Sequence, residues 1–237
     1  DLPEARRNEV ARALDDEQLA SAIEELPEDE QISLIQVLDT ERAADVLEEM
    51  DPDDAADLIR ELPAAMAEEL LQRMDADEAR DVRALLSYAD FTAGAMMTPE
   101  PVIPGADSTV ADGLARVRSE DLTPALASMV FICRSPLDTP SGRYLGAVHI
   151  QRLLREPPSV LAAGLTDHGR SPPSPEATLA EVSRFFATYN LVVAPVVDAE
   201  GRLVGAVTVD DVLDHMLPED WRGDQMDGAE PDEVTRV

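Results

Sequence analysis

Clusters of carboxylates are the residues of this sequence whose types and spacing could do chemistry. Asp210, Asp211 and Asp214 stand at positions i, i+1 and i+4, so Asp210 and Asp214 share one face if this segment is helical. Asp198 stands in the turn before the strand that leads to them. Carboxylate oxygens are the ligands that hard divalent cations prefer. We therefore predict that these side chains contribute to a cation site.

A second group of carboxylates lies in the N-terminal part of the chain. Residues 15–86 contain 24 Asp and Glu against 5 Arg, a net charge of −19. Two like charges about 5 Å apart repel by roughly 3 kcal/mol at an effective dielectric constant near 20, so cations would stabilise such a domain. We predict Asp53, Asp54 and Asp57 as cation ligands, with Glu68 and Glu69 as weaker candidates. The alternative is that each carboxylate belongs to a solvated acidic surface.

The composition argues against several classes of protein. The whole chain has a net charge of −31 and would repel phosphates, so we expect no nucleic-acid partner. His149, His168 and His215 lack the spacing of a zinc site. The sequence has no nucleophile motif and no phosphate-binding loop, so we expect that the protein is not an enzyme. The single cysteine, Cys133, fits a reducing cytoplasm.

Short helices must position the N-terminal carboxylates. Residues 15–86 repeat one phrase of twelve residues six times, with Asp or Pro first, an apolar residue eighth and Leu or Met twelfth. Asp and Pro both suit the start of a helix, and positions 5, 8, 9 and 12 share one helical face. Helices of about nine residues are not stable alone, so they must stack. The pattern predicts a small α-solenoid rather than a continuous coiled coil.

A different pattern begins at Met97 and occurs twice, each time as strand, helix, strand, turn, strand, helix. In the second copy, two β-branched runs join through the hairpin-type turn Asp198–Gly201, and a helix in each copy opens on a capping threonine. The sequence therefore predicts an α+β chain of several domains. Their ranges are a helical N domain at 1–90, a first β-α-β-β-α copy at 91–157, a second copy at 158–217, and a polar tail at 218–237 that is disordered at its end.

The two copies resemble paired cystathionine-β-synthase (CBS) domains. This resemblance rests on the segment GRYLGAV from Gly142 and the segment GRLVGAVTVDDVLD from Gly201. Together with the acidic helical stack and the junction AGAMMTP at residues 93–99, these segments resemble the cytosolic region of MgtE-type magnesium transporters. The resemblance extends from Asp15 to Leu217.

This resemblance implies a regulatory magnesium-sensing module. Its N and CBS domains would close on each other when Mg²⁺ neutralises the acidic faces, and the CBS domains would form a homodimer. The family's transporters continue into a membrane pore, so the module would regulate a transmembrane region in cis or a membrane partner in trans, in the cytoplasm at the inner face of the membrane. No apolar run here approaches the roughly 20 residues of a membrane-spanning helix.

The resemblance also implies a site for ATP or another adenine nucleotide in the second CBS copy. Gly205, Thr208 and Asp211 match the family's nucleotide pattern, whereas the first copy has His149 and Arg152 at the Thr and Asp positions. An Asp carboxylate can accept both ribose hydroxyls, and glycine allows close approach. Two other hypotheses stay open: an adenine-nucleotide sensor whose acidic stack docks a partner, and a helical scaffold that binds a protein.

Overall fold

The computed structural model describes residues 9–119, 122–167, 169 and 171–217. His168 and the tail predicted at 218–237 lie outside these residues. The chain divides into two compact units, and the division falls between Ala79 and Arg80. Residues of each unit contact mainly residues of the same unit. The domain ranges derived from the sequence remain predictions.

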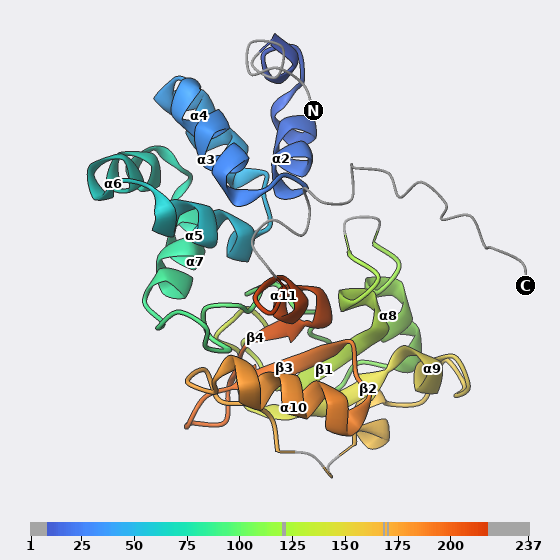
Figure 1. Cartoon of the computed structure of the whole chain (residues 1–237). Coiled ribbons are helices and arrows are strands. Elements are labelled where there is room, and N and C mark those ends of the chain that lie inside the picture. The colour runs from blue at the N-terminus through green and yellow to red at the C-terminus, as the bar shows by residue number, and fades with distance from the viewer. Residues whose placement is uncertain (1–8, 120–121, 168, 170, 218–237) are drawn as a thin grey trace, which may run out of the picture. The chain divides into compact units, whose positions relative to one another are not determined.

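The N-terminal unit consists of short helices that follow the twelve-residue repeat. These are α2 (Asp16–Glu24), α3 (Glu28–Val37), α4 (Thr40–Glu48), α5 (Pro52–Glu61), α6 (Ala64–Arg73) and α7 (Ala76–Leu86), the last of which crosses the division (Figure 1). Each helix begins one residue after the Asp or Pro that opens its repeat. The Asp15 and Asp39 carboxylates accept hydrogen bonds from N–H groups of the first turns of α2 and α4, at 2.9 and 3.1 Å. The predicted stack of short helices is confirmed.

The helices of this unit pack mainly against the helix two positions further along. Contacts join α2 to α4, α4 to α6, and α3 to α5, so one structural step of the solenoid contains two helices. Side chains at positions 5, 8, 9 and 12 of the repeat contribute to the core, as predicted. Those buried at positions 8 and 9 are Ile23, Leu34, Ile35, Val46, Leu47, Leu58, Ile59, Leu70, Leu71 and Val82, and those buried at positions 5 and 12 are Leu19, Ala43, Ala55, Ala79, Met50, Leu62 and Met74. Ala22 departs from the predicted face because it is exposed. Full burial of one such Leu or Ile side chain stabilises the fold by roughly 1.5–3 kcal/mol.

The second unit contains two copies of a two-stranded antiparallel sheet with short helices (Figure 1). In the first copy β1 (Met129–Cys133) pairs with β2 (Tyr144–His149), and in the second β3 (Val193–Val197) pairs with β4 (Leu203–Thr208). The helices are α8 (Val110–Arg116), α9 (Ile150–Leu153), α10 (Leu179–Tyr189) and α11 (Val209–Asp214), with 3₁₀ turns at Leu126–Ser128 and Ala162–Leu165. Thr109 and Thr178 form the capping boxes that open α8 and α10, as predicted.

The first predicted strand of each copy is an extended segment rather than a regular strand. The carbonyl oxygens of Val102 and Pro104 accept hydrogen bonds from β1, at 2.8 and 3.2 Å. In the second copy the carbonyl oxygen of Pro173 accepts one from Val197 at 3.0 Å. A proline in such a segment offers an acceptor but no donor, so it interrupts the ladder. The sequence prediction is therefore wrong in assigning a full strand here.

The two copies of the second unit are joined by exchanged backbone pairs and a shared core. The N–H and carbonyl of Thr98 pair with Ala206 in β4, at 2.9 and 3.0 Å, and the Asp167 N–H donates to Ala147 in β2 at 3.1 Å. Each copy's leading segment therefore pairs with the last strand of the other copy. One apolar cluster combines residues of both copies: Ile103, Met129, Phe131 and Cys133 with Val193, Leu203 and Ala206. The two copies form one compact body.

Candidate functional site

Three carboxylates meet within the N-terminal unit. Glu24 ends α2, Asp51 occupies the N-cap position of α5, and Asp54 lies in the first turn of α5. One oxygen from each carboxylate lies within 4.8 Å of the others. The Asp51 N–H donates to a Glu24 oxygen at 2.9 Å, which fixes the Glu24 side chain at the start of α5. This acidic triad, Glu24, Asp51 and Asp54, is the candidate cation site.

The environment of the triad opposes concentrated negative charge. Burial is the main cause that raises the pKa of the Glu24 carboxyl above its usual value. The hydrogen bond from Asp51 lowers this pKa, whereas the charges of Asp51 and Glu25 raise it further. Asp51 and Asp54 are exposed while Glu24 is half-buried. A cation that neutralises these carboxylates can therefore reach them from solvent and relieve their repulsion.

The solenoid contains a second hydrogen bond like the one between Glu24 and Asp51. Glu48, at the end of α4, accepts a hydrogen bond from the N–H of Asp75 at 2.5 Å, and burial is again the main cause that raises its pKa. Glu24 and Glu48 both occupy position 10 of a repeat, and each reaches position 1 of the repeat three places further on. In the intervening pair the two positions hold Gln36 and Pro63. Proline has no N–H to donate, so a carboxylate at position 36 would find no hydrogen-bond donor at position 63.

The other carboxylates predicted in this unit lie in different surroundings. Asp53 is buried at 9% exposure, whereas its neighbour Asp54 is exposed and belongs to the triad. Asp57 forms an ion pair of 2.7 Å with Arg60, one turn along α5. In α6, Glu68 accepts a hydrogen bond from Gln72 at 2.8 Å and Glu69 pairs with Arg73 at 3.4 Å. The structure thus brings Asp54 together with two carboxylates that the sequence prediction left out.

The carboxylates predicted in the second unit gather at α11. Asp210 is exposed, and Asp211 and Asp214 are half-buried. Burial of Asp211 raises the pKa of its carboxyl to about 6; the hydrogen bonds from Thr208 lower it, and the charges of Asp210 and Asp214 raise it. The three residues lie on one short helix, as the spacing predicted, and their role as cation ligands stays a prediction.

Asp198 lies apart from this group. It belongs to the turn between β3 and β4, and α11 begins at the opposite end of β4, about 20 Å away along a strand of six residues. Its carboxylate accepts hydrogen bonds from the Arg202 N–H and guanidinium, each at 2.8 Å. Burial by itself would raise the pKa of the Asp198 carboxyl, but these bonds and the Arg202 charge lower it overall. The structure does not bring Asp198 together with α11.

The residues predicted to bind a nucleotide also stabilise the fold. Thr208 caps α11, and both its N–H and its hydroxyl donate to one oxygen of Asp211, at 3.0 and 2.7 Å. Gly205 lies where the leading segment of the first copy crosses β4, and a Cβ there would lie 2.6 Å from the Thr98 carbonyl oxygen. Gly146 occupies the corresponding crossing in the first copy, with Thr166. Glycine is therefore required where the two segments of the chain cross, whatever ligand binds.

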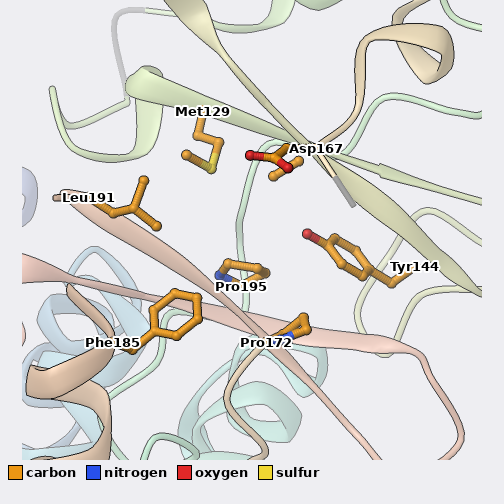
Figure 2. A pocket seen from close by; sticks show the side chains of 8 residues that line it. Met129, Tyr144, Asp167, Pro172, Phe185, Leu191 and Pro195 are labelled. Atoms are coloured by element: carbon orange, nitrogen blue, oxygen red, sulfur yellow. The ribbon is translucent and has the colours of Figure 1, made fainter. Parts of the chain in front are cut away.

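A shallow hollow opens between the two copies of the second unit. Its volume is about 310 Å³, including space open to solvent. The residues that line it are Met129, Tyr144, Ala147, Asp167, Pro172, Phe185, Leu191 and Pro195. Figure 2 shows the Tyr144 hydroxyl directed into this space, with the Asp167 carboxylate and the Phe185 ring on its border. Two aromatic rings and one carboxylate therefore border the same shallow hollow.

Three other reactive side chains of the described residues make contacts within the second unit. Cys133 is buried in β1, and burial raises the pKa of its thiol. His149 accepts the Gln151 N–H at 3.2 Å and so caps α9. The ring of His215 lies edge-on to Phe91, with centroids 5.8 Å apart.

Two sequence families match this chain. The family described as MgtE intracellular N domain matches residues 1–90, and the CBS domain family matches residues 174–218. The crystal structure of the cytosolic domain of the Mg²⁺ channel MgtE in complex with ATP shares 31% identity with this chain. The alignment covers 90% of this chain and 86% of that one, with a TM-score of 0.79. The chain belongs to the MgtE family.

Other MgtE-related proteins extend this finding. The crystal structure of the soluble part of a magnesium transporter is 25% identical, covers 91% of this chain and 83% of its own, and has a TM-score of 0.80. The magnesium transporter MgtE of Thermus thermophilus is 34% identical over 133 residues, which are 56% of this chain and 28% of the transporter. This chain thus spans less than a third of that relative. Among the residues that the structure describes, no helix has the length and apolar character needed to span a bilayer.

The MgtE resemblance drawn from the sequence is confirmed, but both candidate sites contain residues that were not predicted. Glu24 and Asp51 meet across 27 residues of chain, and Tyr144 and Asp167 come from different copies. The twelve-residue repeat holds a signal for the first pair, because acidic residues at position 10 coincide with Asp at position 1 three repeats on. No comparable signal marks the second pair.

Proposed function

We propose that this chain is a regulatory Mg²⁺-sensing region of an MgtE-type transporter and performs no catalysis. The acidic triad of Glu24, Asp51 and Asp54 carries this proposal, because three carboxylate oxygens lie within 4.8 Å of one another and two of the side chains are exposed. Mg²⁺ usually keeps several waters and binds one or two carboxylates directly. The triad offers such a cation direct or water-mediated ligands.

We expect each Mg²⁺ site to bind weakly, as a sensor of cellular Mg²⁺ requires. A millimolar dissociation constant corresponds to about −4 kcal/mol, so a switch near cellular Mg²⁺ levels needs several weak sites acting together. The solenoid provides carboxylates in number, with Asp53 and Asp57 beside the triad on α5. In the second unit, Asp210, Asp211 and Asp214 on α11 are the proposed ligands, with Asp198 as a separate position. Cations at both units would let the acidic N domain and the CBS pair close on each other.

A melting experiment tests this function. At a Mg²⁺ concentration about tenfold above the dissociation constant, one site stabilises the folded state by about 1.4 kcal/mol. We expect Mg²⁺ to raise the melting temperature beyond the effect of NaCl at the same ionic strength. Asp54→Asn should reduce this difference, while Glu41→Gln, which removes an exposed carboxylate from the first turn of α4, should leave it unchanged. Equal shifts in MgCl₂ and matched NaCl for the unaltered chain would show that the acidity is only a solvated surface.

A second candidate function is adenine-nucleotide binding in the second unit. Two observations favour it: the related MgtE cytosolic structure contains ATP, and the hollow between the CBS copies is lined by Tyr144, Phe185 and Asp167. Thr208 and Asp211 are the positions predicted from the sequence. Calorimetric titration with ATP separates the two locations, because Tyr144→Ala should abolish binding in the hollow, whereas Thr208→Ala should abolish binding at α11. A chain that binds neither Mg²⁺ nor nucleotide would instead support the protein-docking scaffold.

We also propose a homodimer formed through the CBS pair. Large apolar side chains of the second unit are exposed, among them Leu154 at 65%, Leu161 at 53% and Leu213 at 47%, and a second copy would cover such a surface. Its membrane partner would be a transporter region in cis, or another chain in trans, at the cytoplasmic face of the membrane. Analytical ultracentrifugation tests the dimer, and a monomer at all concentrations would exclude it.

A further inference from the structure

Phe91 presents an aromatic ring to solvent from an unusual backbone conformation. Its side chain is 59% exposed, and its φ of 58° lies in the left-handed region that bulky residues rarely adopt. Backbone hydrogen bonds with the start of α10 and the residues before it hold Phe91 in place. The Phe91 carbonyl accepts the Leu179 N–H at 2.9 Å, and the Ala93 N–H donates to the Ala177 carbonyl at 2.7 Å. A bulky residue fixed in this way on the surface points to a functional contact.

Residues at the end of α11 extend this ring into an apolar patch. The His215 ring lies edge-on to Phe91, with centroids 5.8 Å apart. Met216 follows and is 59% exposed, and its sulfur accepts the Ser183 hydroxyl of α10 at 3.3 Å. We call Phe91, His215 and Met216 the Phe91 patch. Aromatic and methionine side chains are enriched where proteins bind one another, so the patch has the composition of a docking surface.

The charge around the Phe91 patch is negative. Asp90, which is exposed, precedes the ring, and α11 carries Asp210 and Asp214. On α10, Glu181 and Arg184 attract each other and so offset each other's charge. The whole chain has a net charge of −31. Such a field attracts a basic partner and speeds its encounter, whereas it opposes contact of this patch with an anionic membrane or with a second, equally acidic copy.

We propose that the Phe91 patch is the docking surface for a basic amphipathic helix of a partner protein. The apolar face of such a helix covers the Phe91 ring and the Met216 thioether. Lys or Arg side chains beside that face meet the carboxylates of Asp90 and Asp214. The contact uses no residue of the acidic triad and requires neither Mg²⁺ nor a nucleotide, so it stands apart from the functions proposed above.

Fluorescence anisotropy of the whole chain with a labelled Leu–Lys peptide tests the proposal, at physiological ionic strength and with a chelator present. The peptide has about 18 residues, or five helical turns, with Leu on one face, and a peptide of the same composition in scrambled order is the control. We expect the patterned peptide to bind about tenfold more tightly than the scrambled one. Phe91→Asn removes the ring but suits the left-handed backbone, and it should weaken binding of the patterned peptide about fivefold or more. Val37→Asn, the same replacement at an exposed apolar residue of α3, should leave both affinities unchanged.

Three results would overturn the proposal. Equal affinity for the two peptides, or an affinity that Phe91→Asn does not change, would show that net charge alone attracts them. Self-association that Phe91→Asn abolishes in analytical ultracentrifugation would show that a second copy covers the patch. Binding to phosphatidylglycerol vesicles that the same variant abolishes would assign the patch to a lipid surface. Circular dichroism confirms the folding of each variant, and Met216→Ala, which leaves the Phe91 backbone untouched, provides a second variant for the same titrations.

Discussion

Removing the charge of Asp211 should abolish a large part of the pH dependence of stability. Burial, with the charges of Asp210 and Asp214, raises the pKa of this carboxyl from 3.8 to about 6 in the folded chain. The folded state therefore binds a proton more tightly than the unfolded state. Its stabilising contribution is fully present below pH 3.8 and is lost as pH rises through about 6. A shift of this size corresponds to at most about 3 kcal/mol.

The assay is urea unfolding of the chain and of its Asp211→Asn variant from pH 4 to pH 8, in the presence of a chelator. The amide oxygen can still accept the Thr208 N–H and hydroxyl bonds that close the cap of α11, so the variant retains the cap. Glu24 and Glu48 also have raised pKa values, but they are unchanged in the comparison. We expect the unaltered chain to lose up to about 3 kcal/mol more than the variant between pH 4 and pH 8. Parallel pH profiles for the two proteins, or an Asp211 carboxyl that titrates below pH 4 by NMR, would refute the reasoning.

Two further pairs of substitutions test the close packing at Gly205 and the hydrogen bond of Glu48. Gly205→Ala should destabilise the second unit by about 1–3 kcal/mol, since its Cβ would lie 2.6 Å from a backbone oxygen, while Gly164→Ala, with no atom within 4 Å, should change little; equal losses in urea unfolding would contradict the crossing described above. Glu48→Ala leaves the Asp75 N–H without its carboxylate and should cost about 1 kcal/mol. Glu48→Gln keeps an acceptor and should cost less, so a loss as large as that of the alanine variant in thermal unfolding would count against this bond.

Local signals in the sequence were sufficient to predict the helical stack. Each Asp or Pro at position 1 acts within its own helix, and the apolar stripe acts between neighbours, so a single repeat contains the information. The capping threonines Thr109 and Thr178 are similarly local. The extended leading segments were harder to predict, because proline spacing alone does not show which strand will accept them.

The candidate sites depend on contacts that sequence spacing does not encode. Asp198 and Asp210 are twelve residues apart in sequence, yet β4 separates them, and Arg202 engages Asp198 instead. Gly205 matches a nucleotide pattern, although the crossing with Thr98 already requires a glycine there. The hollow forms only when two copies exchange their leading segments. The sequence alone therefore does not indicate which aromatic and acidic residues line it.

Small-angle X-ray scattering of the whole chain tests the central claim most directly. We propose that divalent cations offset the negative charge of residues 15–86, which is −19, and let the N domain close on the CBS pair. We predict a smaller radius of gyration in millimolar MgCl₂ than in NaCl of equal ionic strength, with the difference reduced in Asp54→Asn. Scattering curves that superimpose in the two salts would contradict the claim.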